Sequence, residues 1–382
     1  MKIYKRTNVW EEALERYRFI FDEFENIVVG ISGGKDSTVT LQIALKIAEE
    51  KNRLPLEVIF LDQEAEWGMV IDYIRELKED KRINLTWYQI PIKIENATSG
   101  TESYLITWEN GKEWMREQEV DSIKENTFGT EIFYDVFAGI FAQKYKGQKA
   151  CYLSGVRAEE SPARTIGLTY YQTYKHITYG KRLDKDRLHF TFYPLYDWSY
   201  TDIWKAIHDN NLGYCPIYDY MYMQGVPLNN MRVSNLNHET ATAVLFYLQE
   251  VEPDTWVALT KRLQGINSAP QLGKSNFNNC PKELPFMFQS WREYRDYLLK
   301  NLITDETINK GMSNKFNDMD IKYDTMHMKD DMYRIQIVTI LTNDSWLTKV
   351  TNWERKPDVH DYRQSKKGRT NRFSSTNKYI NG

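Results

Sequence analysis

The sequence is poor in cysteine, and the few thiols that it has are badly placed for a cluster. Its 3 cysteines, Cys151, Cys215 and Cys280, lie far apart and form no CxxC pair. Structural zinc sites and iron–sulfur clusters are usually built from paired thiols, so we expect neither zinc nor an iron–sulfur cluster. So low a thiol content also suits a reducing compartment.

Long apolar runs and a strong net charge are missing as well. No stretch approaches the roughly 18 consecutive apolar residues of a membrane span, and the N-terminus has no apolar signal core. The 50 basic and 53 acidic side chains leave a formal net charge of −3, which argues against a surface coated with nucleic-acid-binding charge. These absences predict a cytoplasmic protein with no membrane contact.

Hydrophobic residues make up 41% of the 382 residues, and their spacing alternates between two periods. Short apolar runs predict buried strands, and three- and four-residue spacings predict amphipathic helices between them. The expected strands are 27–31, 56–61, 85–90, 150–154 and 189–193. The expected helices are 8–25, 37–51, 67–80, 130–146 and 199–210, and Asn8 is the expected N-cap of the first. Such alternation predicts an α/β fold with a doubly wound, mostly parallel, Rossmann-like sheet.

The alternation fades beyond about residue 212, which predicts three parts. The α/β domain covers 1–235, a mainly helical C-terminal domain covers 236–362, and a basic tail covers 363–382. Helix-like runs in the second part are 238–251, 253–264, 290–302 and 330–342. The tail carries six basic and no acidic side chains. We expect it to be disordered and solvated, with a weak contact to nucleic acid as the alternative.

The turn between the first expected strand and its helix has the composition of an anion site. It reads Ser32-Gly33-Gly34-Lys35-Asp36-Ser37. A helix N-terminus presents unpaired N–H groups and a partial positive charge, and glycines let the backbone approach a ligand closely. Asp36 would repel a bare phosphate, so its presence suggests a bridging Mg²⁺. The turn matches neither GxxxxGK[ST] nor GxGxxG, and a tight turn with no ligand is the alternative.

This turn resembles the pyrophosphate loop, SGGxDS, of the adenine nucleotide alpha-hydrolase (PP-loop) superfamily. Three further segments resemble its phosphoadenosine phosphosulfate (PAPS) reductase branch. Residues 60–67 stand where these reductases have F-x-D-T-G, and Asp62 matches while Gln63 and Glu64 replace the Thr-Gly pair. Residues 154–164 resemble G-x-R-x-x-E-S-x-x-R, and residues 193–204 resemble P-L-x-x-W-x-x-x-D-I-W.

The resemblance implies an adenine nucleotide, ATP or PAPS, as ligand, and a role for each motif. Two arginines that flank a turn after the fourth strand are a natural clamp for phosphate or sulfate oxygens, with surface pairing to Glu159 and Glu160 as the alternative. Asp36 would help to hold Mg²⁺. The implied nucleotide-binding residues are Ser32, Gly33, Gly34, Lys35, Asp36, Ser37, Asp62, Gly155 and Arg157. The implied catalytic residues are Lys35, Asp36, Arg157 and Arg164.

With its long helical C-terminal part, the chain is most similar to the PAPS-reductase-like subgroup of the immunoglobulin-binding regulator A type. That similarity implies a ParB/sulfiredoxin-like protein partner. The chain departs from true PAPS reductases because it has no cysteine after Cys280 and lacks the C-terminal E-C-G-x-H segment that supplies their nucleophilic thiolate. Residues 231–237 align loosely with R-x-G-C-x-x-C of some relatives, which makes Arg232 a further candidate contact.

Three functions are compatible with these motifs. The first, which we favour, is an enzyme that cleaves the α–β bond of ATP and adenylates an acceptor. The second is a non-catalytic nucleotide-binding regulator that acts with a protein partner, or on DNA through the basic tail. The third is a PAPS reductase or sulfur transferase, against which the missing thiol segment argues. The fold alone does not choose between them.

Overall fold

A computed structural model of the chain describes most of its residues. The described ranges are 6–96, 104–170, 174–184, 187–233, 235–238, 245–263, 266, 280–281, 283–342 and 344–376. The chain divides into two compact units. The sheet unit comprises Met1–Ile94, Ile106–Leu236 and Tyr247–Arg262, and the helical unit comprises Glu95–Leu105, Asn237–Phe246 and Leu263–Gly382. The chain leaves the sheet unit after Leu236 and returns to it at Tyr247.

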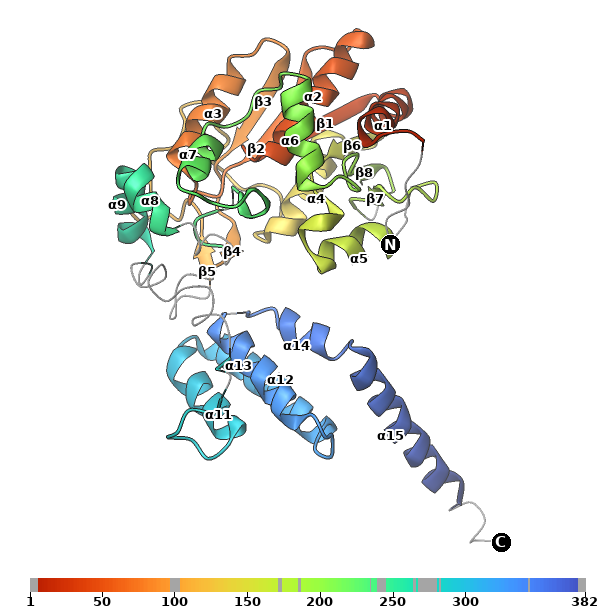
Figure 1. The fold of residues 1–382 in the computed structure, drawn as a ribbon, viewed down its shortest axis with the longest axis vertical. Helices are drawn as coiled ribbons and strands as arrows, with labels where there is room; N and C mark the ends of the chain where they lie inside the picture. The colour runs from red at the N-terminus through yellow and green to blue at the C-terminus, as the bar shows by residue number, and fades with distance from the viewer. Residues whose placement is uncertain are drawn as a thin grey trace. The chain divides into compact units, whose positions relative to one another are not determined.

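The sheet unit is built on a six-stranded sheet in the order β3-β2-β1-β6-β8-β7 (Figure 1). Its strands are β1 Asn26–Ile31, β2 Leu56–Leu61, β3 Ile83–Tyr88, β6 Ala150–Leu153, β7 Gly180–Arg182 and β8 His189–Phe192. All neighbouring pairs are parallel except β7 and β8, which are antiparallel. The prediction of a doubly wound, mostly parallel α/β sheet is therefore confirmed.

The five predicted strands are present because their apolar runs are buried in the sheet. Residues 27–31 of β1 are all buried, which is typical of a parallel strand covered on both faces. The third strand begins at Ile83 rather than at residue 85. The edge strand β7 was not predicted, because Gly-Lys-Arg contains no apolar run. Two short strands, β4 Lys93–Glu95 and β5 Tyr104–Ile106, pair with each other in a second sheet.

Most helices of the sheet unit come from its first 224 residues. They are α1 Val9–Glu23, α2 Lys35–Glu50, α3 Gly68–Lys78, α4 Phe133–Lys144, α5 Pro162–Tyr170, α6 Tyr200–Asp209 and α7 Ile217–Met223, and α9 Pro253–Arg262 lies in the segment that returns to this unit. As predicted, the Asn8 side chain caps α1 by accepting a hydrogen bond from the Glu11 N–H at 2.9 Å. Helix α2 packs against both α1 and α6 (Figure 1).

The direction in which strands are added reverses at β1. The switch point of the sheet therefore lies at the neighbouring strands β1 and β6. The chain runs from β1 to β2 and β3 in one direction, and then to β6 and β8 in the other. Right-handed crossovers in opposite directions place α2 and α3 on one face of the sheet and α4 on the other. Ligands of such sheets bind at the carboxyl ends of the strands beside the switch point.

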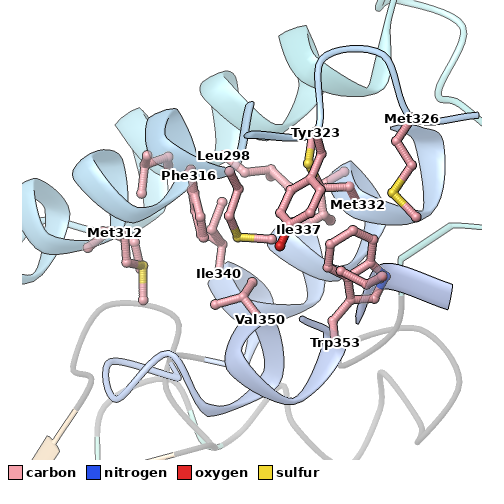
Figure 2. Packing of buried hydrophobic residues seen from close by; sticks show 14 residues of the cluster. Leu298, Met312, Phe316, Tyr323, Met326, Met332, Ile337, Ile340, Val350 and Trp353 are labelled. Atoms are coloured by element: carbon pink, nitrogen blue, oxygen red, sulfur yellow. The ribbon is translucent and has the colours of Figure 1, made fainter. Parts of the chain in front are cut away.

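The helical unit has an apolar core of its own. Its helices among the described residues are α11 Trp291–Leu302, α12 Glu306–Lys322, α13 Lys329–Leu341, α14 Thr348–Trp353 and α15 Pro357–Thr376, and α8 Leu245–Val251 spans the boundary at Tyr247. Figure 2 shows Phe316 and Met312 of α12 packed among residues of α13 and α14, and the rings of Tyr323 and Trp353 meet edge to face with centroids 5.3 Å apart. The core explains why residues without a sheet partner form a compact unit.

Two parts of the C-terminal half differ from expectation. Helix α12 lies in a stretch, 303–357, for which only mixed structure was expected. Its buried Met312, Phe316 and Met319 do follow helical spacing, but polar residues occupy most of the other positions. Helix α15 runs through residues 363–376 of the expected disordered tail. Pro357 suits the first turn of a helix, and Arg363 ties the helix to the Glu354 carboxylate at 2.5 Å. Residues 377–382 of that tail lie outside the described residues.

No helix within the described ranges combines the length and the apolar character that crossing a membrane requires.

The core of the helical unit predicts a strong effect of truncating Phe316. Phe316 is 1% exposed, and the Arg295 guanidinium lies over its ring, 5.5 Å from the ring centroid. We expect Phe316→Ala to lower the free energy of unfolding of this unit by about 3–5 kcal/mol, since a large cavity replaces the ring. Hydrogen exchange of α12 and α13 peptides measures the loss. Ile321→Ala, at a position 76% exposed on the same helix, is the control and should change little; equal effects of the two variants would refute the packing argument.

Candidate nucleotide-binding site

The candidate site lies at the switch point of the sheet. The turn 32–37 leaves the carboxyl end of β1 and begins α2, and residues 154–157 leave the carboxyl end of the neighbouring strand β6. The structure therefore brings the phosphate loop and the first arginine of the clamp motif together, as the resemblance implied. The contact between the two segments is close, because a Cβ atom on Gly155 would lie 2.7 Å from the backbone carbonyl of Asp36 and 2.8 Å from the Ser37 nitrogen.

The phosphate turn is shaped by its own glycines and hydroxyls. Gly33 has φ +70°, which favours glycine, and a Cβ there would lie 2.5 Å from Cγ1 of Val70. The Ser37 hydroxyl donates to the Gly34 carbonyl at 2.9 Å and accepts from the Ser32 N–H at 3.2 Å. Gly34 is the N-cap of α2 and provides no side-chain cap. The two glycines thus leave the first turn of α2 open to an anion.

Lys35 is buried and does not extend into solvent. Only 2% of it is exposed, and its ammonium donates to the Met231 carbonyl and to the Asp36 carboxylate, both at 3.1 Å. Burial lowers the pKa of Lys35, and the charge of Asp36 opposes that shift. The backbone N–H of Lys35 donates to the Tyr218 hydroxyl at 2.9 Å. Tyr218 of α7 therefore covers one amide of the phosphate turn, a contact that no local sequence pattern indicated.

Asp36, whose side chain is partly exposed, joins the two halves of the site through an ion pair with buried Arg157. Its Oδ1 accepts from Nε of Arg157 at 2.5 Å, and Arg157 is only 3% exposed. Arg157 also donates to the Trp198 carbonyl at 3.2 Å and lies 3.4 Å from the Glu159 carboxylate. Asp36 thus already contacts two cations. Within the described ranges, no group of three or more His, Cys, Asp and Glu side chains is placed to hold a metal ion.

The second arginine of the clamp motif, Arg164, lies on α5 and pairs with the Glu160 carboxylate. The side chain of Arg164 is 46% exposed, so this pair contributes little to stability. The Arg232 guanidinium donates to the backbone carbonyl of the same Glu160 at 3.0 Å. Two guanidinium groups from distant parts of the chain therefore meet beside Glu160, within the segment that contains Arg157.

Asp62, implied to border the nucleotide, lies in a buried polar network at the end of β2. Its carboxylate is 0% exposed and accepts from the Trp87 indole at 3.0 Å, from the Gln89 amide at 2.9 Å and from Arg116. Through these hydrogen bonds Asp62 helps to hold the loop 62–67, which connects β2 to α3. The excursion after residue 96, expected to be irregular, supplies Arg116 to this network.

Two further acids of this loop, which the sequence did not single out, are buried beside Asp62. Glu64 is 0% exposed and accepts from Arg262 at 2.6 Å. Glu66 is 6% exposed, and its partner is the Asn235 amide at 2.8 Å. Burial, reinforced by the charge of Asp62, raises the pKa of Glu66 to about 8. Glu66 therefore holds its proton at neutral pH and can donate a hydrogen bond.

The three cysteines are poor nucleophiles in this structure. Cys151 and Cys215 are 0% exposed, and Cys280 is half-buried. Burial raises the pKa of all three thiols, in Cys215 to about 12. Since the thiolate is the reactive form, none of them is prepared for attack on sulfur.

Gly155→Ala tests the close contact between the two halves of the site. Because backbone atoms of Asp36 and Ser37 would crowd the new methyl group, we expect the variant to displace the phosphate turn and to lose about 1–3 kcal/mol of stability. Thermal unfolding measures the loss. Gly167→Ala is the matched control, since a Cβ there meets nothing within 4 Å. Retention of full stability by Gly155→Ala would contradict the contact.

Glu66→Gln tests the buried acid. Between the ordinary pKa of 4.5 and about 8, the folded protein keeps the Glu66 proton while the unfolded chain releases it. Stability of the parent protein therefore falls as pH rises through this window, by up to about 1.4 kcal/mol per pH unit from this group. The glutamine has no such proton, so its stability relative to the parent should rise from pH 5 to pH 8 and then level off. Chemical unfolding at several pH values checks this, with Glu15→Gln, whose side chain is 73% exposed, as control; parallel pH profiles of Glu66→Gln and parent would disprove it.

Comparison with known proteins finds relatives over most of the chain. An uncharacterized protein of Escherichia coli (strain K12), YbdN, is 29% identical over 328 residues, which are 79% of this chain and 78% of that protein. An adenosine 5′-phosphosulfate reductase of Lysinibacillus sphaericus is 21% identical over 262 residues, 68% of this chain and 92% of the reductase. Among solved structures, a Candida glabrata FMN adenylyltransferase in complex with FMN and the ATP analog AMPCPP matches with 16% identity and a TM-score of 0.35, over 58% of this chain and 65% of that one.

Two family models divide the chain between them. Residues 225–348 match a domain of unknown function, DUF3440. Residues 26–224, which include the phosphate turn, the loop 62–67 and the arginine segment, match the phosphoadenosine phosphosulfate reductase domain. That second match spans more than half of the chain, so the chain belongs to the PAPS reductase domain family of PP-loop proteins.

Proposed function

We propose that the sheet unit binds ATP at the turn 32–37 and cleaves its α–β bond, transferring AMP to an acceptor and releasing pyrophosphate. The observation that carries the proposal is the open first turn of α2, at the switch point of the sheet, with the cations Lys35 and Arg157 held beside it. Such a turn suits the phosphates of a nucleotide. The cations balance the charge that collects on the leaving pyrophosphate.

The transfer is a displacement at the α-phosphorus. A nucleophilic oxygen of the acceptor forms a bond to that phosphorus, the bond to the bridging oxygen breaks, and pyrophosphate leaves with the electron pair. The acceptor proton passes to solvent. Backbone amides of the turn, Lys35 and Arg157 would hold the leaving group in place, while Arg164 and Arg232 beside Glu160 favour an acidic acceptor.

Mg²⁺ fits this arrangement as a companion of the nucleotide. Magnesium in such sites usually takes one or two carboxylates and completes its shell with phosphate oxygens and water. Asp36, in the first turn of α2, is the carboxylate that would hold it. When bound, the ion neutralises part of the negative charge of the phosphates.

Reduction of PAPS is the weaker alternative, because it requires a reactive thiol. The three cysteines are buried or half-buried and their thiol pKa values are raised. PAPS is the alternative bound ligand in this proposal, since its phosphates suit the same turn.

A regulatory function is the second candidate, and the helical unit favours it. Its separate core and the basic helix α15 provide surface that the reaction does not need. We infer that the chain belongs to the immunoglobulin-binding regulator A-type subgroup, with a ParB/sulfiredoxin-like protein as partner and nucleic acid as a further one for the basic tail. If the chain is a regulator, ATP binding changes its affinity for the partner protein, and the α–β bond of ATP is not cleaved. A cytoplasmic location suits both candidates.

Incubation with ATP and Mg²⁺ distinguishes the two candidates. The transferase predicts pyrophosphate and AMP-bearing acceptor in equal amounts, in the presence of a ParB/sulfiredoxin-like partner or of a candidate acidic acceptor. Arg157→Gln should slow pyrophosphate release by about 10²–10³-fold, as expected for loss of a charge donor at the leaving group. Arg18→Gln, a surface arginine paired with Glu50, should leave the rate unchanged. Tight ATP binding without turnover by any combination would refute the transferase and leave the regulator.

A further inference from the structure

Three of the connections between the two units converge on one loop of the nucleotide site. The chain passes between the units at 94/95, 105/106, 236/237, 246/247 and 262/263. Residues of the sheet unit at or near the second, third and fifth of these points bond to the loop 62–67. This loop follows β2, the strand that pairs with β1 on the side away from β6.

Residues beside the second and third connections donate hydrogen bonds to the loop. Two residues beyond the second, the Trp108 N–H donates to the Glu64 carboxylate at 2.7 Å, and the Trp108 indole donates to the Asp62 carbonyl at 2.9 Å. At the third, the Leu236 N–H donates to the Ala65 carbonyl at 2.7 Å. The loop is therefore shaped by segments distant in sequence.

The fifth connection reaches the loop through a buried ion pair. Arg262, the last residue of the sheet unit before that connection, donates from Nε to Glu64 at 2.6 Å and from Nη2 to the Ile106 carbonyl at 2.8 Å. The side chain of Arg262 is 7% exposed and that of Glu64 is 0% exposed. Removal of one partner from a buried pair leaves an uncompensated charge, which is far more costly than loss of a surface pair.

Glu64 needs this support because its backbone is strained. Its φ is +66°, in the left-handed region that a residue with a side chain adopts at a cost of roughly 1–2 kcal/mol. The same returning segment, Tyr247–Arg262, also fixes the far end of the loop. The Glu252 carboxylate accepts from the N–H groups of Gly68 and Met69, at 2.7 and 2.9 Å, and so caps α3.

The shape of this loop reaches the phosphate turn through α3. Val70, in the first turn of α3, lies so close to Gly33 that a Cβ atom on Gly33 would be 2.5 Å from its Cγ1. A shift at the start of α3 therefore changes the space available to the turn at its glycine of positive φ.

We propose that Arg262 is a positioning residue for the nucleotide site: through Glu64 it holds the loop 62–67, and with it the start of α3, in the form that lets the phosphate turn bind a nucleotide. Glu252 assists by capping α3. Both residues lie outside the matched range 26–224, so the segment 247–262 completes a site whose motifs all lie before it. The binding part of this proposal rests on the proposed function.

Arg262→Gln in the full chain tests the proposal with two measurements. Hydrogen exchange without nucleotide should rise in peptides covering 62–70 and stay unchanged in α2, α4 and the helical unit. The dissociation constant for MgATP, measured by calorimetry, should rise about 10–100-fold, as expected when a residue that supports a site from outside is removed. Arg262→Lys retains the charge and should restore part of both, and it serves as the second variant if the glutamine fails to fold.

Arg75→Gln is the matched control, because Arg75 lies on α3 but pairs with exposed Asp72 and with Glu119 and does not reach the loop. It should leave both readouts at parent values. Faster exchange throughout the sheet unit, or unchanged exchange and binding in a folded Arg262→Gln, would overturn the positioning role. If the parent protein binds no MgATP, the proposed function fails; the exchange measurement then decides alone, a rise confined to 62–70 supporting the role of Arg262 and its absence refuting it.

Discussion

The ion pair between Asp36 and Arg157 is the interaction on which the candidate site depends. It ties the first turn of α2 to the segment after β6, and so closes the switch point of the sheet. Desolvation of two charges costs several kcal/mol per ion, which the pairing must offset. Gly155 makes the pairing possible, since any side chain there would separate the two segments. The geometry of the phosphate turn therefore follows from a contact between residues 121 positions apart.

Two neighbouring strands end in loops that are stabilised in opposite ways. After β1 the turn 32–37 is held by hydrogen bonds of its own hydroxyls, and its glycines add no side chain to the first turn of α2. After β2 it buries three acids, Asp62, Glu64 and Glu66, against two arginines, Arg116 and Arg262. Arg116 pairs with Asp62 and Arg262 with Glu64, while burial, reinforced by the charge of Asp62, raises the pKa of the third acid, Glu66, to about 8. The protein itself fills the end of β2, whereas the end of β1 is the candidate ligand site.

The parts of the fold that could be predicted are those set by local pattern. The strands 27–31 and 56–61 are continuous apolar runs, and the turn that begins at Ser32 combines a strand end, two glycines and a helix start. Edge strand β7 has no such pattern, because pairing with β8 alone makes it a strand. Helix α12 was missed because its apolar positions are few and separated by polar residues.

The site was predictable only where its residues belong to a motif. Arg157 and Gly155 could be placed beside the phosphate turn because parallel strands end at one edge of the sheet. Tyr218 and Arg262 could not, since each reaches its partner across more than 180 residues and neither lies in a recognisable pattern. For Asp62 the motif gave the right strand end, but the number of donors around its carboxylate depends on Arg116 and Trp87, which only the folded chain brings there.

The boundary between the two matched families does not coincide with the physical boundary of the nucleotide site. Residues 26–224 contain the motifs, but Glu64 within that range finds its compensating charge on Arg262, and α3 finds its cap on Glu252. A chain ending at residue 224 would bury the Glu64 carboxylate without a cation and leave the first amides of α3 without an acceptor. The segment that follows the family domain is therefore part of the folding unit of that domain, and loss of that segment disturbs the loop beside the candidate site.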